Sequence, residues 1–491
     1  MEKATQTLEQ PVETTTVDGN SMLELILANM QTTDEREATT LETAITELTA
    51  PAVADASTDG DVLKAIDRAV AGIENRMSAQ VRAIKKHPDY QALESKWQGV
   101  QRLVRKAPLG KDMKLYLWNV SREDVLADHT GSQNDILRTR LYDVICREPI
   151  ETLGGEPFNF AVVGWQFGPS AEDMDLLGHM AEVAEQAQSV ILAPAAPGFF
   201  GVDDFSRLMR HPGDLKQMFE DDRYAEWKAF RATTKARHVG LMVPRFLARL
   251  PYGAKTRRAQ GLEFFEERAE GADSTGFVWS NLAYLFSERI AVALGEEGWP
   301  TKITGWQGGG RVPDLHVYTP ENGGGRTAAF PPTDTVVDGL LEPALAELGF
   351  IAMQWKKGSK DGVFDAAVSP HVPKETNSEG ANASAAVGAR LPVLLATCRI
   401  GHYVKKMLKT VIGAQWAQQD IQSFLTGWIM KYVAVNKPLA PLKDATVNVV
   451  PVPGKPGVFD VKLTLVPWIG IEAFNVTLDI SAPSPKPIDN P

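Results

Sequence analysis

The clearest pattern along this chain is a run of apolar residues spaced three and four apart between Asp61 and Pro88. Such spacing predicts one long amphipathic helix, in which about 25 residues would extend about 40 Å. The apolar positions of the run are Val62, Ile66, Ala69, Val70, Ile73, Met77, Val81 and Ile84. A second helix is predicted after Pro88, with apolar residues at Leu93, Trp97, Val100, Leu103 and Val104.

The middle of the chain mixes strand and helix patterns. The helical pattern at 171–188 separates two short apolar runs, and this order is typical of a parallel crossover. The polar turn at 356–361 also separates two such runs, and it predicts a β-hairpin. Strands are predicted at 114–120, 158–164, 189–193, 238–243, 350–355 and 362–368. Together these elements predict a mixed α/β (α+β) fold.

The last third changes character. A long amphipathic helix is predicted at 390–413, and Arg399, Lys406 and Lys409 share one of its faces. This basic face is either solvated or in contact with another protein. Alternating residues at 446–480, interrupted by Pro- and Gly-rich turns, then predict a set of strands.

The N-terminal 60 residues read as a separate region. Residues 1–20 have the polar composition of a mobile tail, and residues 51–60 that of a linker. Between them, Ser21 and Glu24 fit a capping box that begins a short helix. Its apolar residues Leu23, Leu25, Ile26 and Leu27 would dock on the chain's own fold or on another protein. We predict an N-terminal region at 1–60, a central α/β domain at 61–375 and a C-terminal domain at 376–491.

Charge and composition argue against several classes of protein, namely nucleic-acid-binding, membrane-spanning and disulfide-rich secreted proteins. The chain has 491 residues and a net charge of −11, without a basic tract that would favour nucleic acid or anionic membrane. The first residues lack the apolar segment of a signal peptide, and no apolar run approaches the ~18 residues of a membrane span. The two cysteines, Cys146 and Cys398, are too few for a disulfide framework. We therefore expect a cytoplasmic protein.

No local motif assembles a catalytic or metal site. The segment Gly253–Thr256 resembles a phosphate-binding loop but lacks its glycines. The segment Gly271–Gly276 misses the spacing of a nucleophile elbow and follows a charged helix. The eight histidines are scattered, no HExxH motif occurs, and the two cysteines are isolated from each other. The sequence thus predicts no cofactor and no metal, although an α/β enzyme with a dispersed site remains an alternative.

Five long blocks occur in a fixed order along the chain: HPDYQALESKWQGVQRLV at 87–104, GGEPFNFAVVGWQFG at 154–168, WSNLAYLFSERIA at 279–291, GWQGGGRVPDLHVY at 305–318 and RLPVLLATCRIGHYVKKMLKTVIG at 390–413. These blocks resemble the large-subunit family of type VI secretion contractile sheaths, the TssC or VipB type. The resemblance extends from about residue 20 to about residue 481. The set of blocks in this order is far more specific than any one of them.

This resemblance implies a structural protein. A large subunit of this family pairs with a small subunit of the TssB or VipA type and polymerises with further copies of itself. The polymer surrounds an inner tube of the Hcp type, is assembled on a membrane-anchored baseplate, and contracts to drive the tube out of the cell. A AAA+ unfoldase of the ClpV type then dismantles the contracted sheath. The sheath of a related contractile particle, such as a phage tail or tailocin, is the nearest alternative.

The resemblance also suggests roles for particular residues. The N-terminal helix with Leu23, Leu25, Ile26 and Leu27 would be the recognition element for the unfoldase. The C-terminal strands would interlock with neighbouring subunits through Val458, Val461, Leu463 and Leu465. The basic face with Arg399, Lys406 and Lys409 would meet the inner tube or an acidic neighbour, if it is not simply solvated.

Overall fold

The computed structural model describes residues 59–483 outside a series of short gaps, together with Thr39, Thr43 and Glu47. The gaps are 111–112, 134, 153, 209–210, 254–255, 261–263, 267–276, 320–328, 412–415, 434–441, 452–458 and 468–477. The chain divides into two compact units. Met1–Tyr90 and Pro251–Arg268 form the smaller one, whereas Gln91–Leu250 and Ala269–Pro491 form the larger. The predicted domain boundaries at 60 and 375 stay predictions.

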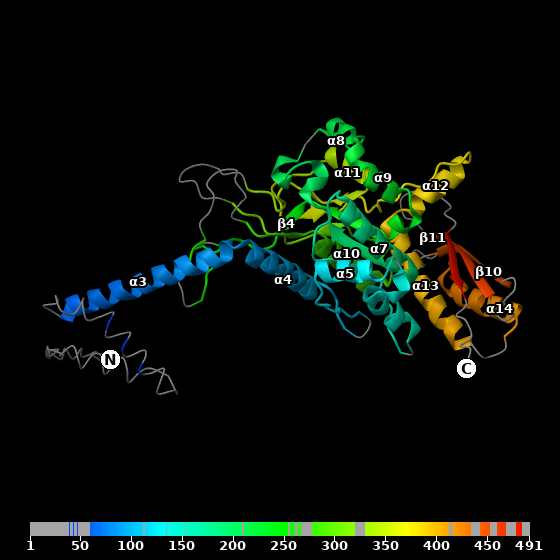
Figure 1. Ribbon diagram of the computed structural model, residues 1–491, viewed down its shortest axis with the longest axis horizontal. Coiled ribbons are helices and arrows are strands. Elements are labelled where there is room, and N and C mark those ends of the chain that lie inside the picture. Colours follow the sequence, from blue (N-terminus) through cyan, green and yellow to red (C-terminus); the bar gives the residue numbers. More distant parts are fainter. Residues whose placement is uncertain are drawn as a thin grey trace, which may run out of the picture. The chain divides into compact units, whose positions relative to one another are not determined.

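The smaller unit contains the long helix α3, which spans Asp59–Lys86 and confirms the first predicted helix (Figure 1). Its amphipathic pattern leaves several apolar side chains exposed, among them Met77 at 48% and Ile84 at 57%. At its C-terminal end the Lys85 ammonium lies 5.1 Å from the ring centroids of both Tyr90 and Tyr252. These cation–π contacts fix the end of α3 against the segment that follows Pro251.

Most of helix α4, Pro88–Lys106, belongs to the larger unit, and it confirms the second predicted helix. Gly99 faces the ring of Tyr284 so closely that a Cβ would lie 2.2 Å from a ring carbon. Ser95 donates a hydrogen bond of 2.8 Å to the carbonyl oxygen of Trp279. The absence of a side chain at one position thus allows α4 to approach the rest of the unit.

A four-stranded parallel sheet forms the centre of the larger unit, with the order β1-β2-β3-β7. Its strands are β1 Phe160–Val162, β2 Val190–Pro194, β3 Val239–Val243 and β7 Phe350–Ala352. Helix α7, Ala171–Ala187, connects β1 to β2, and these two strands pair in parallel, so the predicted crossover is confirmed. Because β2 and β3 are buried along their whole length, their sequences read as continuous apolar runs.

The sheet has an apolar core on each face. Ile191 and Ala193 of β2 belong to a core shared with helices α7, α8, α9 and α11, whereas Val190 and Leu192 belong to a second core shared with α10 and α13. This alternation follows from the two-residue period of a strand. The bounds of these helices are α8 Pro212–Met218, α9 Ala225–Arg231, α10 Ala283–Glu297, α11 Leu341–Glu347 and α13 Leu391–Val411. The predicted mixed α/β class is confirmed.

Two small antiparallel sheets accompany the central one. In the first, β4 Arg245–Leu247 pairs with β5 Trp279–Asn281. The second has the order β6-β9-β8, with β6 Arg311–Val312, β9 Gly362–Val363 and β8 Gln354–Trp355. The predicted hairpin is therefore present between β8 and β9. The single strand predicted at 350–355 was wrong, because the chain changes sheets at the fully buried Met353.

The strand predicted at 114–120 is also wrong for the isolated chain. These residues form neither helix nor strand, and they lead into helix α5, Arg122–Gly131. The capping box of α5 explains where that helix begins, since Ser121 and Asp124 satisfy each other's backbone amides. A one-turn helix α6, Arg140–Tyr142, and a π-helix at Asp143–Glu151 follow α5.

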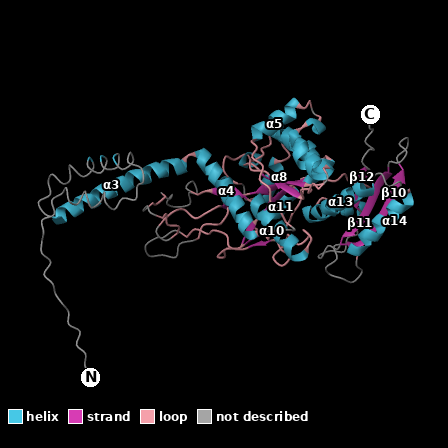
Figure 2. Ribbon diagram, turned by 90° about the horizontal axis from the view of Figure 1, so that it is seen from below, coloured by secondary structure: helices cyan, strands magenta, loops and turns pink. Residues whose placement is uncertain are grey.

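The C-terminal part of the larger unit packs two helices against an antiparallel sheet (Figure 2). Helix α12 spans Glu379–Gly388, α13 follows it, and α14 spans Gln418–Ile429. The sheet has the order β10-β11-β12, with β10 Leu442–Pro451, β11 Phe459–Pro467 and β12 Leu478–Pro483. The predicted helix at 390–413 and the first two predicted C-terminal strands are confirmed, whereas most of the third predicted strand lies outside the described residues. We call α13, α14 and this sheet the C-terminal module.

Candidate assembly site

The described polar groups of the larger unit do not converge on a metal or catalytic centre. Among the described residues, no group of three or more His, Cys, Asp or Glu side chains is arranged to hold a metal ion. One open hollow is lined by Trp306, Gln354, Trp355, Lys356 and Val363. The single charge in this lining is the Lys356 ammonium, 5.6 Å from the ring centroid of Trp306. This hollow presents no acid–base pair and no nucleophile with an adjacent base.

In the part of the chain that the structure describes, none of the helices has both the length and the apolar composition required to cross a membrane.

The buried ion pairs of the larger unit connect segments far apart in the sequence. Arg102 on α4 donates to Glu288 on α10 over 2.9 Å, and it also donates to the carbonyl oxygens of Pro313 and Asp314. The Glu288 side chain is fully buried and has Arg289 as a second partner at 2.6 Å. Such a cluster holds helices together, because each charge has a partner inside the protein.

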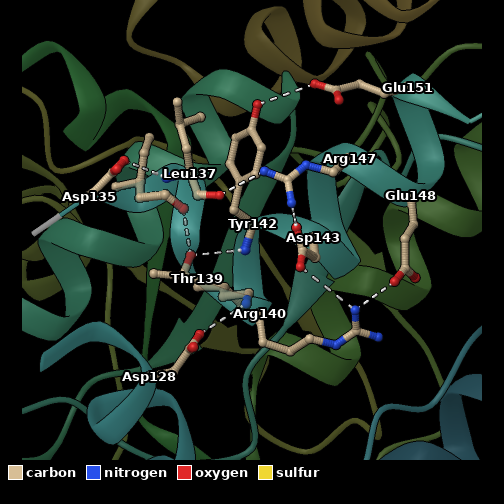
Figure 3. A network of polar contacts seen from close by, with 12 residues as sticks. Asp128, Asp135, Leu137, Thr139, Arg140, Tyr142, Asp143, Arg147, Glu148 and Glu151 are labelled. Carbon is tan, nitrogen blue, oxygen red and sulfur yellow. Dashed lines mark hydrogen bonds and ion pairs between the residues drawn. The ribbon is translucent and has the colours of Figure 1, made fainter. Parts of the chain in front are cut away.

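A second network surrounds the π-helix (Figure 3). Arg147 contacts the Asp143 carboxylate and donates to the carbonyl oxygen of Leu137 over 2.7 Å. Arg140 donates to the Glu148 carboxylate over 2.6 Å. These groups are largely exposed and pair with close neighbours along the chain, so they order the 135–151 region and do not form a binding site.

Three neutral histidines cluster around α7. His179 stacks on His129, with ring centroids 4.2 Å apart, and burial together with this neighbour lowers the pKa of His179 to about 4. His238 donates through Nδ1 to the Ser189 carbonyl oxygen over 2.7 Å, and His402 donates through Nε2 to the Ala187 carbonyl oxygen over 2.9 Å. Burial lowers the pKa of each of these two imidazoles to about 4 as well.

We expect the protein to lose stability as the pH falls from 7 to 5. An unfolded histidine binds a proton near pH 6.5, whereas these folded imidazoles stay neutral down to about pH 4. The unfolded state therefore takes up more protons, which costs about 2 kcal/mol of stability for each of the three residues. Asp334 offsets about 1 kcal/mol of this loss, because burial raises its folded pKa to about 6.

Denaturant unfolding at pH 7 and pH 5 measures this dependence. His179→Gln should flatten it, whereas His87→Gln, which changes a largely exposed imidazole, should leave it unchanged. Equal pH dependence in all three proteins would show that His179 is not a source of the effect.

The basic side chains on one face of α13 donate hydrogen bonds to carbonyl oxygens of the same chain. Arg399 donates to Gly298, the residue that caps α10, over 2.5 Å. Lys406 donates to the carbonyl oxygen of Gly155, and Lys409 to that of Ile150 over 2.6 Å. Cations near helix ends stabilise the unpaired carbonyl oxygens and the negative end of the helix dipole. The shared face was predictable from the spacing, but the carbonyl partners lie 101 to 259 residues away.

The strand residues that were predicted to contact neighbouring subunits also make contacts within their own chain. Val461, Leu463 and Leu465 are at most 1% exposed and face α13 and α14 within the C-terminal module. Their strand β11 is the central one, so its main chain is already paired on both sides. Val458 lies outside the described residues, as do Leu23, Leu25, Ile26 and Leu27. Contacts of all these residues with other subunits stay predictions.

Comparison with known proteins identifies the family of this chain. A family model described as the EvpB/VC_A0108 tail sheath N-terminal domain matches residues 67–371, and one described as the EvpB/VC_A0108 tail sheath gpW/gp25-like domain matches residues 380–483. The chain is also 32% identical over 498 residues to the type VI secretion system sheath protein TssC1 of Pseudomonas aeruginosa, with 99% of each chain covered. The chain belongs to the type VI secretion sheath family.

Membership confirms the family resemblance and makes this sheath protein a large-subunit type. The second family model covers α13, α14 and the β10–β12 sheet, so the C-terminal module of this sheath protein lies within a recognised tail sheath domain. Sequence reasoning did not find the Arg102–Glu288 pair or the stacked His129 and His179. No local motif signals either of them, since each joins residues at least 50 positions apart.

Proposed function

We propose that this sheath protein is a non-enzymatic subunit that pairs with a small sheath subunit, polymerises around an inner tube and contracts to propel it. The observation that carries this proposal is the match over 99% of both chains to a protein named as a type VI secretion system sheath protein. The internal pairing of the buried charges supports it, because they hold elements together and do not surround a reaction site. The name of that relative favours a secretion system over a phage tail or tailocin.

The partners in this proposal are those that a contractile sheath requires. They are the small subunit, further copies of this chain, an inner tube of the Hcp type, a baseplate and a AAA+ unfoldase of the ClpV type. An open helical polymer needs two different patches on each subunit, since a single self-complementary patch would close into a dimer. We propose assembly in the cytoplasm on a membrane-anchored baseplate.

Co-expression with the neighbouring small-subunit gene, followed by electron microscopy, tests the proposal. We expect long hollow tubules, and we expect this chain to be poorly soluble when it is expressed alone. Discrete particles from the co-expressed pair, or a monomer whose melting is unaffected by the partner, would contradict the proposal. Binding of the unfoldase to Leu23→Asp/Ile26→Asp tubules, compared with wild-type tubules, measures the role proposed for the N-terminal helix.

A further inference from the structure

The segment Lys114–Val120 has the sequence pattern of a strand but has no strand partner. Among the residues that the structure describes, no backbone amide or carbonyl group of this segment makes a backbone hydrogen bond. Its sequence, KLYLWNV, is rich in the aromatic and aliphatic residues that favour strands. A main chain of this kind offers a row of donors and acceptors to an added strand.

Side-chain contacts hold this segment in place while its main chain stays available. The Tyr116 hydroxyl donates to the Glu156 carboxylate over 3.0 Å, and Lys114 pairs with the same carboxylate. The Tyr116 ring lies edge-on to Phe158, with ring centroids 5.6 Å apart. At the other end, Val120 packs against the core of the parallel sheet. A segment fixed in this way loses less entropy when a partner strand pairs with it.

Four consecutive side chains of the segment are large, apolar or aromatic, and exposed. Leu115 is 37% exposed, Tyr116 57%, Leu117 62% and Trp118 43%. With roughly 200 Å² for each side chain, about 400 Å² of their surface faces solvent. Exposed apolar areas of a few hundred Å² on a monomer are often functional.

Helix α4, which precedes the segment in the sequence, also has exposed apolar side chains. Leu93, Trp97 and Val104 are 54%, 57% and 46% exposed. Together with the segment they present about 700 Å². This summed exposed area is close to the ~800 Å² that one partner contributes to a standard-size interface.

We infer that Lys114–Val120 receives a β-strand from the small sheath subunit, with α4 as the adjoining contact. This inference rests on the proposed function, which supplies that subunit. A second copy of this chain is the less suitable occupant, because pairing of the segment with itself across a twofold axis would give a closed dimer. The added strand carries apolar side chains at alternate positions and no proline, so that its main chain can complete the ladder.

Leu117→Asp in the co-expressed pair tests the inference, with Leu340→Asp as the matched control. Leu340 is a leucine of the larger unit that is 73% exposed and lies outside this surface. We expect Leu117→Asp to weaken binding of the small subunit by at least about tenfold, since a charge replaces an apolar contact in the new strand pair. Leu340→Asp should bind the small subunit and form tubules as wild type does.

Hydrogen exchange of the wild-type pair provides the second measurement. Amides at 115–119 should exchange as slowly as those of β10, whereas exchange as fast as in the 356–361 turn would overturn the inference. Normal binding by Leu117→Asp, or slow exchange at 115–119 in a dimer of this chain alone, would overturn it as well. If the wild-type pair still forms tubules, these contrary results leave the proposed function intact. The absence of tubules from the wild-type pair would contradict the proposed function itself.

Discussion

Arg102→Met is expected to destabilise the larger unit by about 2–3 kcal/mol, because it leaves a fully buried carboxylate with only one of its two partners. The substitution also removes the donors to the carbonyl oxygens of Pro313 and Asp314. Methionine retains the apolar part of the arginine side chain, so most of the loss reflects charge and hydrogen bonding. Denaturant unfolding of the co-expressed pair measures the effect.

Two further variants separate this explanation from a general effect of altering α4. Arg105→Met changes an exposed arginine of the same helix and should stay within about 0.5 kcal/mol of wild type. Adding Glu288→Gln to Arg102→Met should recover part of the stability, since the buried charge is then absent. If the double variant is less stable than Arg102→Met alone, the cost does not come from the partner that the buried carboxylate has lost.

Val461→Pro is expected to unfold the C-terminal module before it affects any contact between subunits, because the lost ladder hydrogen bond alone costs about 1–3 kcal/mol. Val461 is fully buried and lies opposite Val449 in the β10–β11 ladder. Proline removes a ladder hydrogen bond from a central strand that is paired on both sides. Amides of β10 and α14 should then exchange rapidly, while those of β2 and β3 keep their protection.

The neighbouring position supplies the control. Lys462 lies on the opposite face of β11 from Val461, so Lys462→Thr should preserve the exchange pattern. The hypothesis that these strands link neighbouring subunits predicts a different result for Val461→Pro. In that case Val461→Pro would give heterodimers with a protected C-terminal module that do not polymerise, and this result would contradict local unfolding as the effect of the proline.

Elements with a long or fully buried pattern could be predicted from the sequence. Helices α3 and α13 have sustained three- and four-residue periodicity, and β2 and β3 are short apolar runs buried on both faces. The segment at 114–120 shows the limit of this reasoning. Its composition favours a strand, but a strand also needs a neighbour, and pairing depends on residues that are distant in the sequence or belong to another chain.

The candidate site residues were less predictable for the same physical reason. Spacing on a helix shows that Arg399, Lys406 and Lys409 share a face, but it cannot show which carbonyl oxygens they meet. Alternation along β11 identifies its apolar face without showing whether that face covers its own helices or a neighbouring subunit. In both cases the sequence specifies a surface, whereas its partner is determined by tertiary structure.

Helix α13 gives the larger unit a mechanical connection. Its first half, with Leu391 and Leu395, belongs to a core of the parallel sheet, and its second half, with Val404 and Leu408, belongs to the core of the C-terminal module. One rigid rod of about 31 Å thus joins the two parts without a hinge. A force applied to the β10–β12 sheet along the axis of α13 would act on all side-chain contacts of the helix together. A displacement of that sheet would therefore be transmitted directly to β2 and β3.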